Sequence, residues 1–194
     1  MDYKTNSLIE LIYQEIENFI RDWQASPYEW NTEVEMQAEI YNRLVKKLIS
    51  NLIQKAKYKV KDDRFKEGQN YRRICCEPLI FYLDKSGEIC HCFPDIVVYD
   101  DIDNPDSPPD FRGEANWPML WVCEIKYQNE FSGGTSRDNK NWDSEKIKYL
   151  LEYEKGKAKF ACFLDFDRTK PNSDKNFSYE DDNNFRQYRI MLPK

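Results

Sequence analysis

Acidic residues beside proline or lysine are the first candidates for chemistry in this chain. Pro-Asp pairs occur three times, and carboxylate-x-Lys triplets also occur three times. Only the pair that ends at Asp95 opens into an apolar run, and only the triplet from Glu124 to Lys126 closes one. The other copies lie in polar loops or at the chain terminus, where little would hold their geometry. Asp95, Glu124 and Lys126 are therefore the candidate chemical residues.

The spacing of the triplet predicts a shared site. Residues two apart on a β-strand point to the same face, so Glu124 and Lys126 project together and Ile125 points to the other face. If Asp95 comes from a neighbouring strand, two carboxylates and one ammonium group meet. Two carboxylates alone repel each other, and Mg²⁺ or Mn²⁺, which prefer oxygen ligands, removes that conflict. Such an ion polarises a phosphoryl oxygen and activates water, which predicts a phosphodiesterase site with Lys126 supporting the water or the phosphate.

These motifs resemble those of the PD-(D/E)xK nuclease superfamily. The family's Pro-Asp corresponds to Pro94-Asp95, and its acid-x-Lys corresponds to Glu124-Ile125-Lys126. The resemblance implies a restriction-endonuclease-like fold, with a mixed sheet flanked by helices and an α-β-β-β-α-β core. It also implies Mg²⁺ or Mn²⁺ bound by Asp95, Glu124 and the carbonyl of Ile125, and metal-dependent cleavage of DNA or, less often, RNA.

Many members of the family add an acidic residue on the helix before the first core strand. Here we prefer Glu33, at the edge of the apolar face of that helix, with Gln37 one turn later as its support. Glu39 recurs with polar and basic residues and is expected to face solvent, and Glu35 remains an alternative. The family often carries a lysine or glutamine on the helix after the acid-x-Lys strand, for which Lys146 and Lys148 are candidates.

The elements that must position these residues follow from hydrophobic periodicity. Amphipathic helices are predicted at 6–24, at 32–54 behind a Thr32-x-x-Glu35 capping box, and at 142–155. Strands are predicted at 71–83, 88–99, 118–128, 158–166 and 186–192, with the first two paired as a hairpin and a polar loop between the last two. Residues 100–117 read as a loop, and Gly133-Gly134 begins another flexible stretch. The order α-α-β-β-β-α-β-β predicts one α/β domain spanning 1–194, with a core at 31–166 and a helical appendage at 1–26.

Composition and charge restrict the class of protein. The chain has 194 residues, 15% aromatic residues and a formal net charge of −6, which allows a sizeable core and argues against a uniformly basic surface. Residues 55–73 carry a net charge of +5 and residues 95–114 carry −6. We expect Lys55 to Arg73 to supply phosphate contacts. Apolar runs of at most five residues and the lack of a basic-then-apolar N-terminus predict a cytoplasmic protein without a membrane partner.

The remaining reactive residues are interpreted as structural. The six cysteines form no C-x-x-C pair, so reduced, mostly buried thiols are expected, with a metal site of Cys75, Cys76, Cys90 and Cys92 or disulfides as alternatives. His91 is the only histidine, which disfavours catalytic triads and histidine-rich metal sites. Asp165 and Asp167 are either supporting ligands or solvated acids. Trp117, Trp121 and Trp142 bracket the site and could stack on bases, although Trp121 is expected in the core.

The predicted function is a metal-dependent phosphodiesterase acting on nucleic acid, DNA in preference to RNA, as an endonuclease or exonuclease. One alternative is an inactive nuclease-like module for binding or assembly. Another is a structural partner in a larger complex, suggested by the amphipathic helix at 6–24. Cutting both strands of a duplex would favour a two-fold homodimer. Base preference lies in loops and cannot be read from the sequence.

Overall fold

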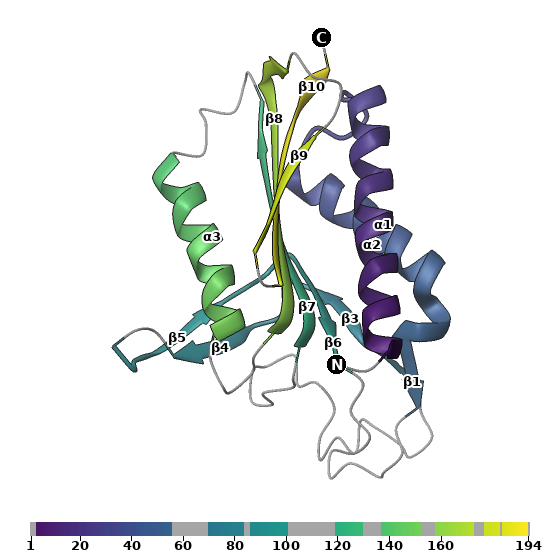
Figure 1. Cartoon of the computed structure of the whole chain (residues 1–194), viewed down its shortest axis with the longest axis vertical. Helices are drawn as coiled ribbons and strands as arrows, with labels where there is room; N and C mark the ends of the chain where they lie inside the picture. The colour runs from purple at the N-terminus through teal and green to yellow at the C-terminus, as the bar shows by residue number, and fades with distance from the viewer. Residues whose placement is uncertain are drawn as a thin grey trace.

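A mixed β-sheet separates one pair of helices from a third helix (Figure 1). The computed structural model describes residues 3–55, 70–83, 86–100, 119–129, 137–152, 158–172, 177–182 and 184–193. The helices are α1 (Tyr3–Ala25), α2 (Glu33–Leu52) and α3 (Arg137–Glu152). The strands are β1 (Ile53–Lys55), β2 (Asn70–Arg72), β3 (Ile74–Cys76), β4 (Ile80–Leu83), β5 (Ile89–Cys92), β6 (Ile96–Tyr99), β7 (Met119–Gln128), β8 (Ala158–Asn172), β9 (Ser178–Asp182) and β10 (Phe185–Pro193). The α/β class and the mixed sheet flanked by helices are therefore confirmed.

The main sheet has the strand order β3-β6-β7-β8-β10-β9. Strands β3, β6 and β7 are mutually antiparallel, β7, β8 and β10 run parallel, and β9 returns antiparallel at the edge. Two short pairs, β1 with β2 and β4 with β5, stand apart from it. Along the chain, the series α2, β3, β6, β7, α3, β8 has the expected order α-β-β-β-α-β, with the β4–β5 hairpin inserted after β3.

The predicted hairpin between 71–83 and 88–99 is correct only for the parts nearest its turn. Both segments divide at a proline: Pro78 separates β3 from β4, and Pro94 separates β5 from β6. Proline lacks an N–H for the ladder, so strands end beside it. Glu77, just before the first proline, adopts a positive φ of 48°. As a result β4 pairs with β5, whereas β3 pairs with β6 in the main sheet.

The C-terminal part also differs from the prediction. Strand β8 continues to Asn172, and residues 178–182 form β9 where a polar loop was expected. The sequence of β9, Ser-Tyr-Glu-Asp-Asp, has no strand-like alternation, but an edge strand tolerates charged residues, which discourage pairing with another chain. Helix α3 begins at Arg137, five residues before the predicted start at 142.

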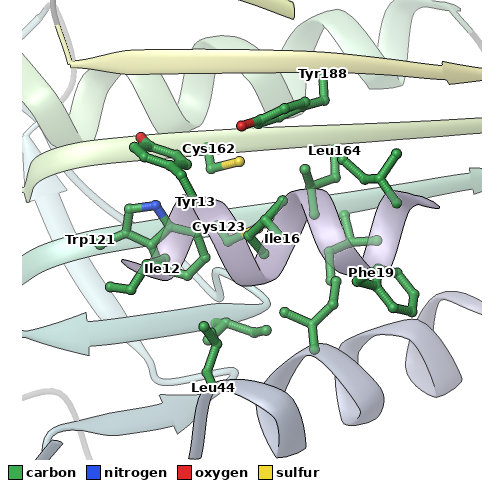
Figure 2. Packing of buried hydrophobic residues seen from close by; sticks show 14 of the residues in the cluster. Ile12, Tyr13, Ile16, Phe19, Leu44, Trp121, Cys123, Cys162, Leu164 and Tyr188 are labelled. Atoms are coloured by element: carbon green, nitrogen blue, oxygen red, sulfur yellow. The ribbon is translucent and has the colours of Figure 1, made fainter. Parts of the chain in front are cut away.

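The predicted appendage at residues 1–26 packs into the same core as the sheet. Helix α1 places Ile12, Ile16 and Phe19 against β7 and β8, and all three are fully buried (Figure 2). At its C-terminal end, the Trp23 and Phe166 rings meet edge to face with centroids 5.1 Å apart. Burying each such side chain contributes roughly 1.5–3 kcal/mol. Because the apolar face of α1 is covered by its own domain, the reason for inferring a partner surface there is removed.

Helix α3 covers the opposite face of the sheet. Ile147 and Leu150 of α3 join a second buried cluster with residues of β6, β7 and β8. The β4–β5 hairpin belongs to this layer, because Tyr82 stacks on Tyr149 of α3 at 6.3 Å between ring centroids. The hairpin is thereby anchored beside the helix it flanks in Figure 1.

Several predictions fall on residues outside the described ranges, namely most of the basic run, the acidic proline loop from 101, Trp117 and Gly133-Gly134. None of the six cysteines forms a disulfide, and Cys92, Cys123 and Cys162 are buried. Among the helices that the structure describes, none combines the length and apolar character needed to span a membrane.

Candidate active site

The candidate site lies where β7 extends past the start of β6. The last register pair is Ile96 with Cys123, so β7 has no β6 partner from Glu124 onward. Two side-chain carboxylates accept backbone N–H groups of this free edge. Asp95 Oδ2 accepts from Ile125 N at 2.5 Å, and Glu33 Oε2 accepts from Tyr127 N at 3.1 Å. An acid from the β5–β6 connection and an acid from α2 thus reach the same stretch of strand.

Lys126 lies among three carboxylates. Its Nζ is 3.0 Å from Glu124 Oε1, 3.3 Å from Asp143 Oδ2 and 3.8 Å from Glu33 Oε1. The predicted shared face of Glu124 and Lys126 is confirmed, and Ile125 points into the core on the other face. Burial alone would lower the pKa of Lys126, but the charges of Glu124 and Glu33 outweigh it and raise that pKa. The ammonium group is therefore held protonated.

Helix α3 contributes two residues to the cluster. Lys146 Nζ lies 3.3 Å from Glu124 Oε1 and 3.2 Å from Asp143 Oδ1. Lys146 was one of two candidates on this helix; the other, Lys148, instead lies over the Phe185 ring at 4.8 Å. Asp143 was not anticipated from the sequence. The only available signal was its i,i+3 spacing from Lys146, which is common on exposed helices.

The start of α2 distinguishes the three candidate acids of that helix. The capping box is confirmed: Glu35 N donates to Thr32 Oγ1 at 3.2 Å, and Thr32 N donates to Glu35 Oε2 at 3.1 Å. Glu39 pairs with Arg43 at 2.7 Å. Only Glu33 reaches β7, as the sequence analysis preferred.

Gln37 supports a different residue from the one expected. Its side-chain Nε2 donates to the backbone carbonyl of Asp95 at 2.8 Å instead of contacting Glu33. The backbone N of Glu77 donates to the same carbonyl at 3.2 Å. Two donors therefore fix the backbone of Asp95, while Ile125 fixes its carboxylate.

The electrostatics of Asp95 show an excess of negative charge. Burial and the neighbouring Glu124 raise the pKa of Asp95 to about 7, although the Ile125 N–H and Lys126 act in the opposite direction. Counting formal charges, four carboxylates (Glu33, Asp95, Glu124 and Asp143) face two ammonium groups (Lys126 and Lys146), which leaves −2 when all are ionised. A divalent cation would balance this charge.

The donor chemistry of these residues fits a hard cation such as Mg²⁺ or Mn²⁺. Both lysines contact Oε1 of Glu124, whereas Oε2 is buried without a hydrogen-bond partner. A buried carboxylate oxygen without a partner is costly unless a cation completes it. In a strand, the carbonyl of a residue shares the side of its N–H, so the Ile125 carbonyl belongs to the edge that Asp95 caps. The described residues contain no group of three or more His, Cys, Asp or Glu side chains suited to a metal, whereas this ligand set has two side chains and one carbonyl.

One predicted phosphate contact is wrong, and a cysteine metal centre has no support. Arg73 is only 6% exposed and donates through Nε to the Tyr99 carbonyl at 3.0 Å, so its head group belongs to the interior. In the described part of the basic run, no other side chain is placed. Cys76 is exposed whereas Cys92 is buried, because the two lie on separate hairpin and sheet strands.

The other residues considered lie around the site without joining it. Asp165 pairs in register with Lys126 on β8, and Asp167 accepts from the Thr169 N at 2.9 Å. His91 is exposed on β5, with its ring 6.0 Å from that of Phe93. Trp121 is fully buried in the core, as predicted, and the side chain of Trp142 lies outside the described residues.

Comparison with known proteins adds no relative: no family model matches the chain, and neither a curated protein nor a solved structure is similar enough to count as a match. The function must therefore be inferred from the site itself.

Proposed function

We propose that this chain is a metal-dependent nuclease of the PD-(D/E)xK type, which hydrolyses phosphodiester bonds of nucleic acid and prefers DNA to RNA. The observation that carries the proposal is the convergence of Asp95, Glu124 and Lys126. Asp95 caps Ile125 in the middle of the acid-x-Lys triplet, and Lys126 Nζ lies 3.0 Å from Glu124 Oε1. A random short motif has no reason to fold back onto its distant partner in this way.

The arrangement of elements supports the same proposal. The series α2, β3, β6, β7, α3, β8 matches a restriction-endonuclease-like core, and the candidate residues lie on its central strands and first helix. The β4–β5 hairpin, β9 and β10 are then additions to that core. The six unpaired cysteines suit a reducing compartment, which favours the cytoplasm as the place of action.

Asp95, Glu124 and the Ile125 carbonyl would hold the Mg²⁺ or Mn²⁺. When bound, such an ion supplies a Lewis acid for a phosphoryl oxygen and lowers the pKa of a water ligand. Lys126, kept protonated by its carboxylates, orients the attacking water or offsets negative charge that develops on the phosphate. Glu33 positions Lys126 through their 3.8 Å ion pair and fixes the strand through Tyr127 N.

The second lysine has a positioning role in this scheme. Lys146 bridges Glu124 and Asp143, so it holds the Glu124 carboxylate in one orientation. Asp143 in turn contacts both ammonium groups and keeps them in one cluster. The two α3 residues therefore hold the strand residues in place.

Cleavage of labelled DNA and RNA in Mg²⁺ tests the proposal, with Lys126→Ala as the decisive variant. We expect Lys126→Ala to lose cleavage by at least about a hundredfold, in line with the loss of one transition-state donor. Lys148→Ala is the matched control, because Lys148 is a lysine of α3 that lies over Phe185 away from the cluster. Circular and linear substrates distinguish endonuclease from exonuclease action. A folded wild-type protein that cleaves neither nucleic acid would support the inactive binding or assembly module instead.

A further inference from the structure

A buried arginine without an acidic partner lies beside the candidate active site. Arg168, on β8, is only 6% exposed. Its Nη1 donates to Asn31 Oδ1 at 3.2 Å, and among the described residues no carboxylate pairs with it. Buried guanidinium groups are normally paired, because removing their charge from water is costly. A site that lacks a built-in anion is suited to an external one.

Two tyrosines sandwich this guanidinium. Its Cζ lies 4.7 Å from the ring centroid of Tyr28 and 5.8 Å from that of Tyr127, which are cation–π distances. Asn31 joins the parts, because its Nδ2 donates to the Tyr28 carbonyl at 3.1 Å while its Oδ1 accepts from Arg168. Tyr28 is nevertheless 69% exposed. One face of its ring covers the arginine, and the rest is open to a planar ligand.

The arginine can still be reached by an anion. None of its side-chain nitrogens is among the described polar atoms that are sealed from solvent without a partner. The acids nearest to it along the chain already have donors: Glu33 binds Tyr127 N, and Glu35 closes the capping box of α2. The guanidinium therefore has donors to offer and no neighbouring carboxylate that takes them.

This cluster is continuous with the candidate active site. Asn31 lies two residues before Glu33, and Tyr127 directly follows Lys126 and donates its N–H to Glu33. A strand whose phosphate lies at Asp95 and Glu124 would therefore have its neighbouring nucleotide close to Arg168. A guanidinium suits a phosphate, and an exposed tyrosine ring suits a base.

We propose that Arg168 binds a backbone phosphate that flanks the phosphate to be cleaved, and that Tyr28 stacks on the adjacent base. The inference rests on the proposed nuclease function and specifies its substrate. A base can stack on Tyr28 only when it is unpaired, so the preferred substrate is single-stranded, or unpaired at this flank.

Anisotropy of a labelled single-stranded oligonucleotide with 5′-hydroxyl ends, measured in EDTA so that no cleavage occurs, tests the subsite. We expect Arg168→Gln to weaken binding by about tenfold and to reduce the slope of log K against log salt concentration by about 0.7, the value for one lost phosphate contact on a single strand. Tyr28→Ala should weaken binding by about tenfold without changing the slope, whereas Tyr28→Phe should retain affinity. A duplex of the same sequence should bind more weakly than the single strand and respond less to Tyr28→Ala.

Arg189→Gln is the matched control, because Arg189 is a largely exposed arginine on β10 that pairs only with an exposed glutamate. If Arg168→Gln is folded by circular dichroism and matches this control in affinity and salt slope, the inference is wrong. If Arg168→Gln does not fold, unchanged affinity of Tyr28→Ala overturns it. A wild-type protein that cleaves while both variants bind normally refutes the subsite alone. A folded wild-type protein that neither binds nor cleaves nucleic acid refutes the nuclease proposal as well.

Discussion

The carboxylate of Glu33 accepts the backbone N–H of Tyr127 at 3.1 Å, across 94 residues of sequence. Glu33 is the first residue of α2, and Tyr127 lies near the end of β7. The contact therefore joins the beginning of a helix to the strand that carries Glu124 and Lys126. The position of Glu33 depends on where α2 begins, which the capping box determines.

Thr32→Ala removes the side-chain oxygen that accepts the Glu35 N–H. We expect the free energy of unfolding to fall by about 1 kcal/mol, the usual cost of losing an N-cap. Urea denaturation measures this, and cleavage assays should show reduced activity because Glu33 is held less firmly. Thr32→Ser keeps the oxygen and should resemble wild type. Equal losses in the two variants would show that the cap is not the cause.

Ile16→Ala tests whether α1 belongs to the core. Ile16 is fully buried between α1 and the sheet, so its truncation should lower the free energy of unfolding by about 2–5 kcal/mol. Leu11→Ala is the control on the same helix, because Leu11 is 36% exposed and should cost far less. Chemical denaturation compares the two. Equal effects would mean that α1 packs differently from Figure 2.

The raised pKa of Asp95 predicts how the stability of the metal-free protein depends on pH. With a pKa of about 7 in the folded chain against about 3.9 when unfolded, the folded state binds the extra proton between these values. This contribution to stability is therefore present at acid pH and is lost as pH rises through about 7. In EDTA, urea denaturation at pH 5 and pH 8 should show wild type losing more stability than Asp95→Asn. A parallel pH dependence in both proteins would contradict the assignment.

Mg²⁺ should stabilise the wild-type protein, because a ligand that binds only the folded state raises the free energy of unfolding. The gain should be greater at pH 8 than at pH 6, since Asp95 must lose its proton to bind a cation. Thermal melts with and without Mg²⁺ measure it. Glu124→Gln should abolish the gain, whereas Glu39→Gln, which alters a glutamate paired with Arg43, should retain it. A gain that survives Glu124→Gln would place the ion elsewhere.

The sequence was sufficient to predict which distant residues come together. Asp95 and the Glu124–Lys126 triplet stood out because each borders an apolar run, and burial of those runs positions them. Thr32 and Glu35 marked the start of α2 because capping is a local interaction. Local signals and burial therefore account for the predicted part of the site.

What could not be predicted depends on tertiary partners. Asp143 shows nothing unusual in sequence, and it belongs to the site only because α3 packs beside β7. The charged segment 178–182 reads as a loop until β10 provides a partner for it as an edge strand. Pro78 and Pro94 each break a continuous apolar run, and only the sheet pairing shows that β3 continues its ladder in β6.

The inserted β4–β5 hairpin leaves the sheet after Cys76 and returns at Ile96, and these two residues are register partners. Because the excursion begins and ends at the same place, its length can change without displacing either flanking strand. Evolution or an engineer can therefore exchange this module for another arm, to alter what the protein grips, while the catalytic chassis downstream of Pro94 is inherited intact.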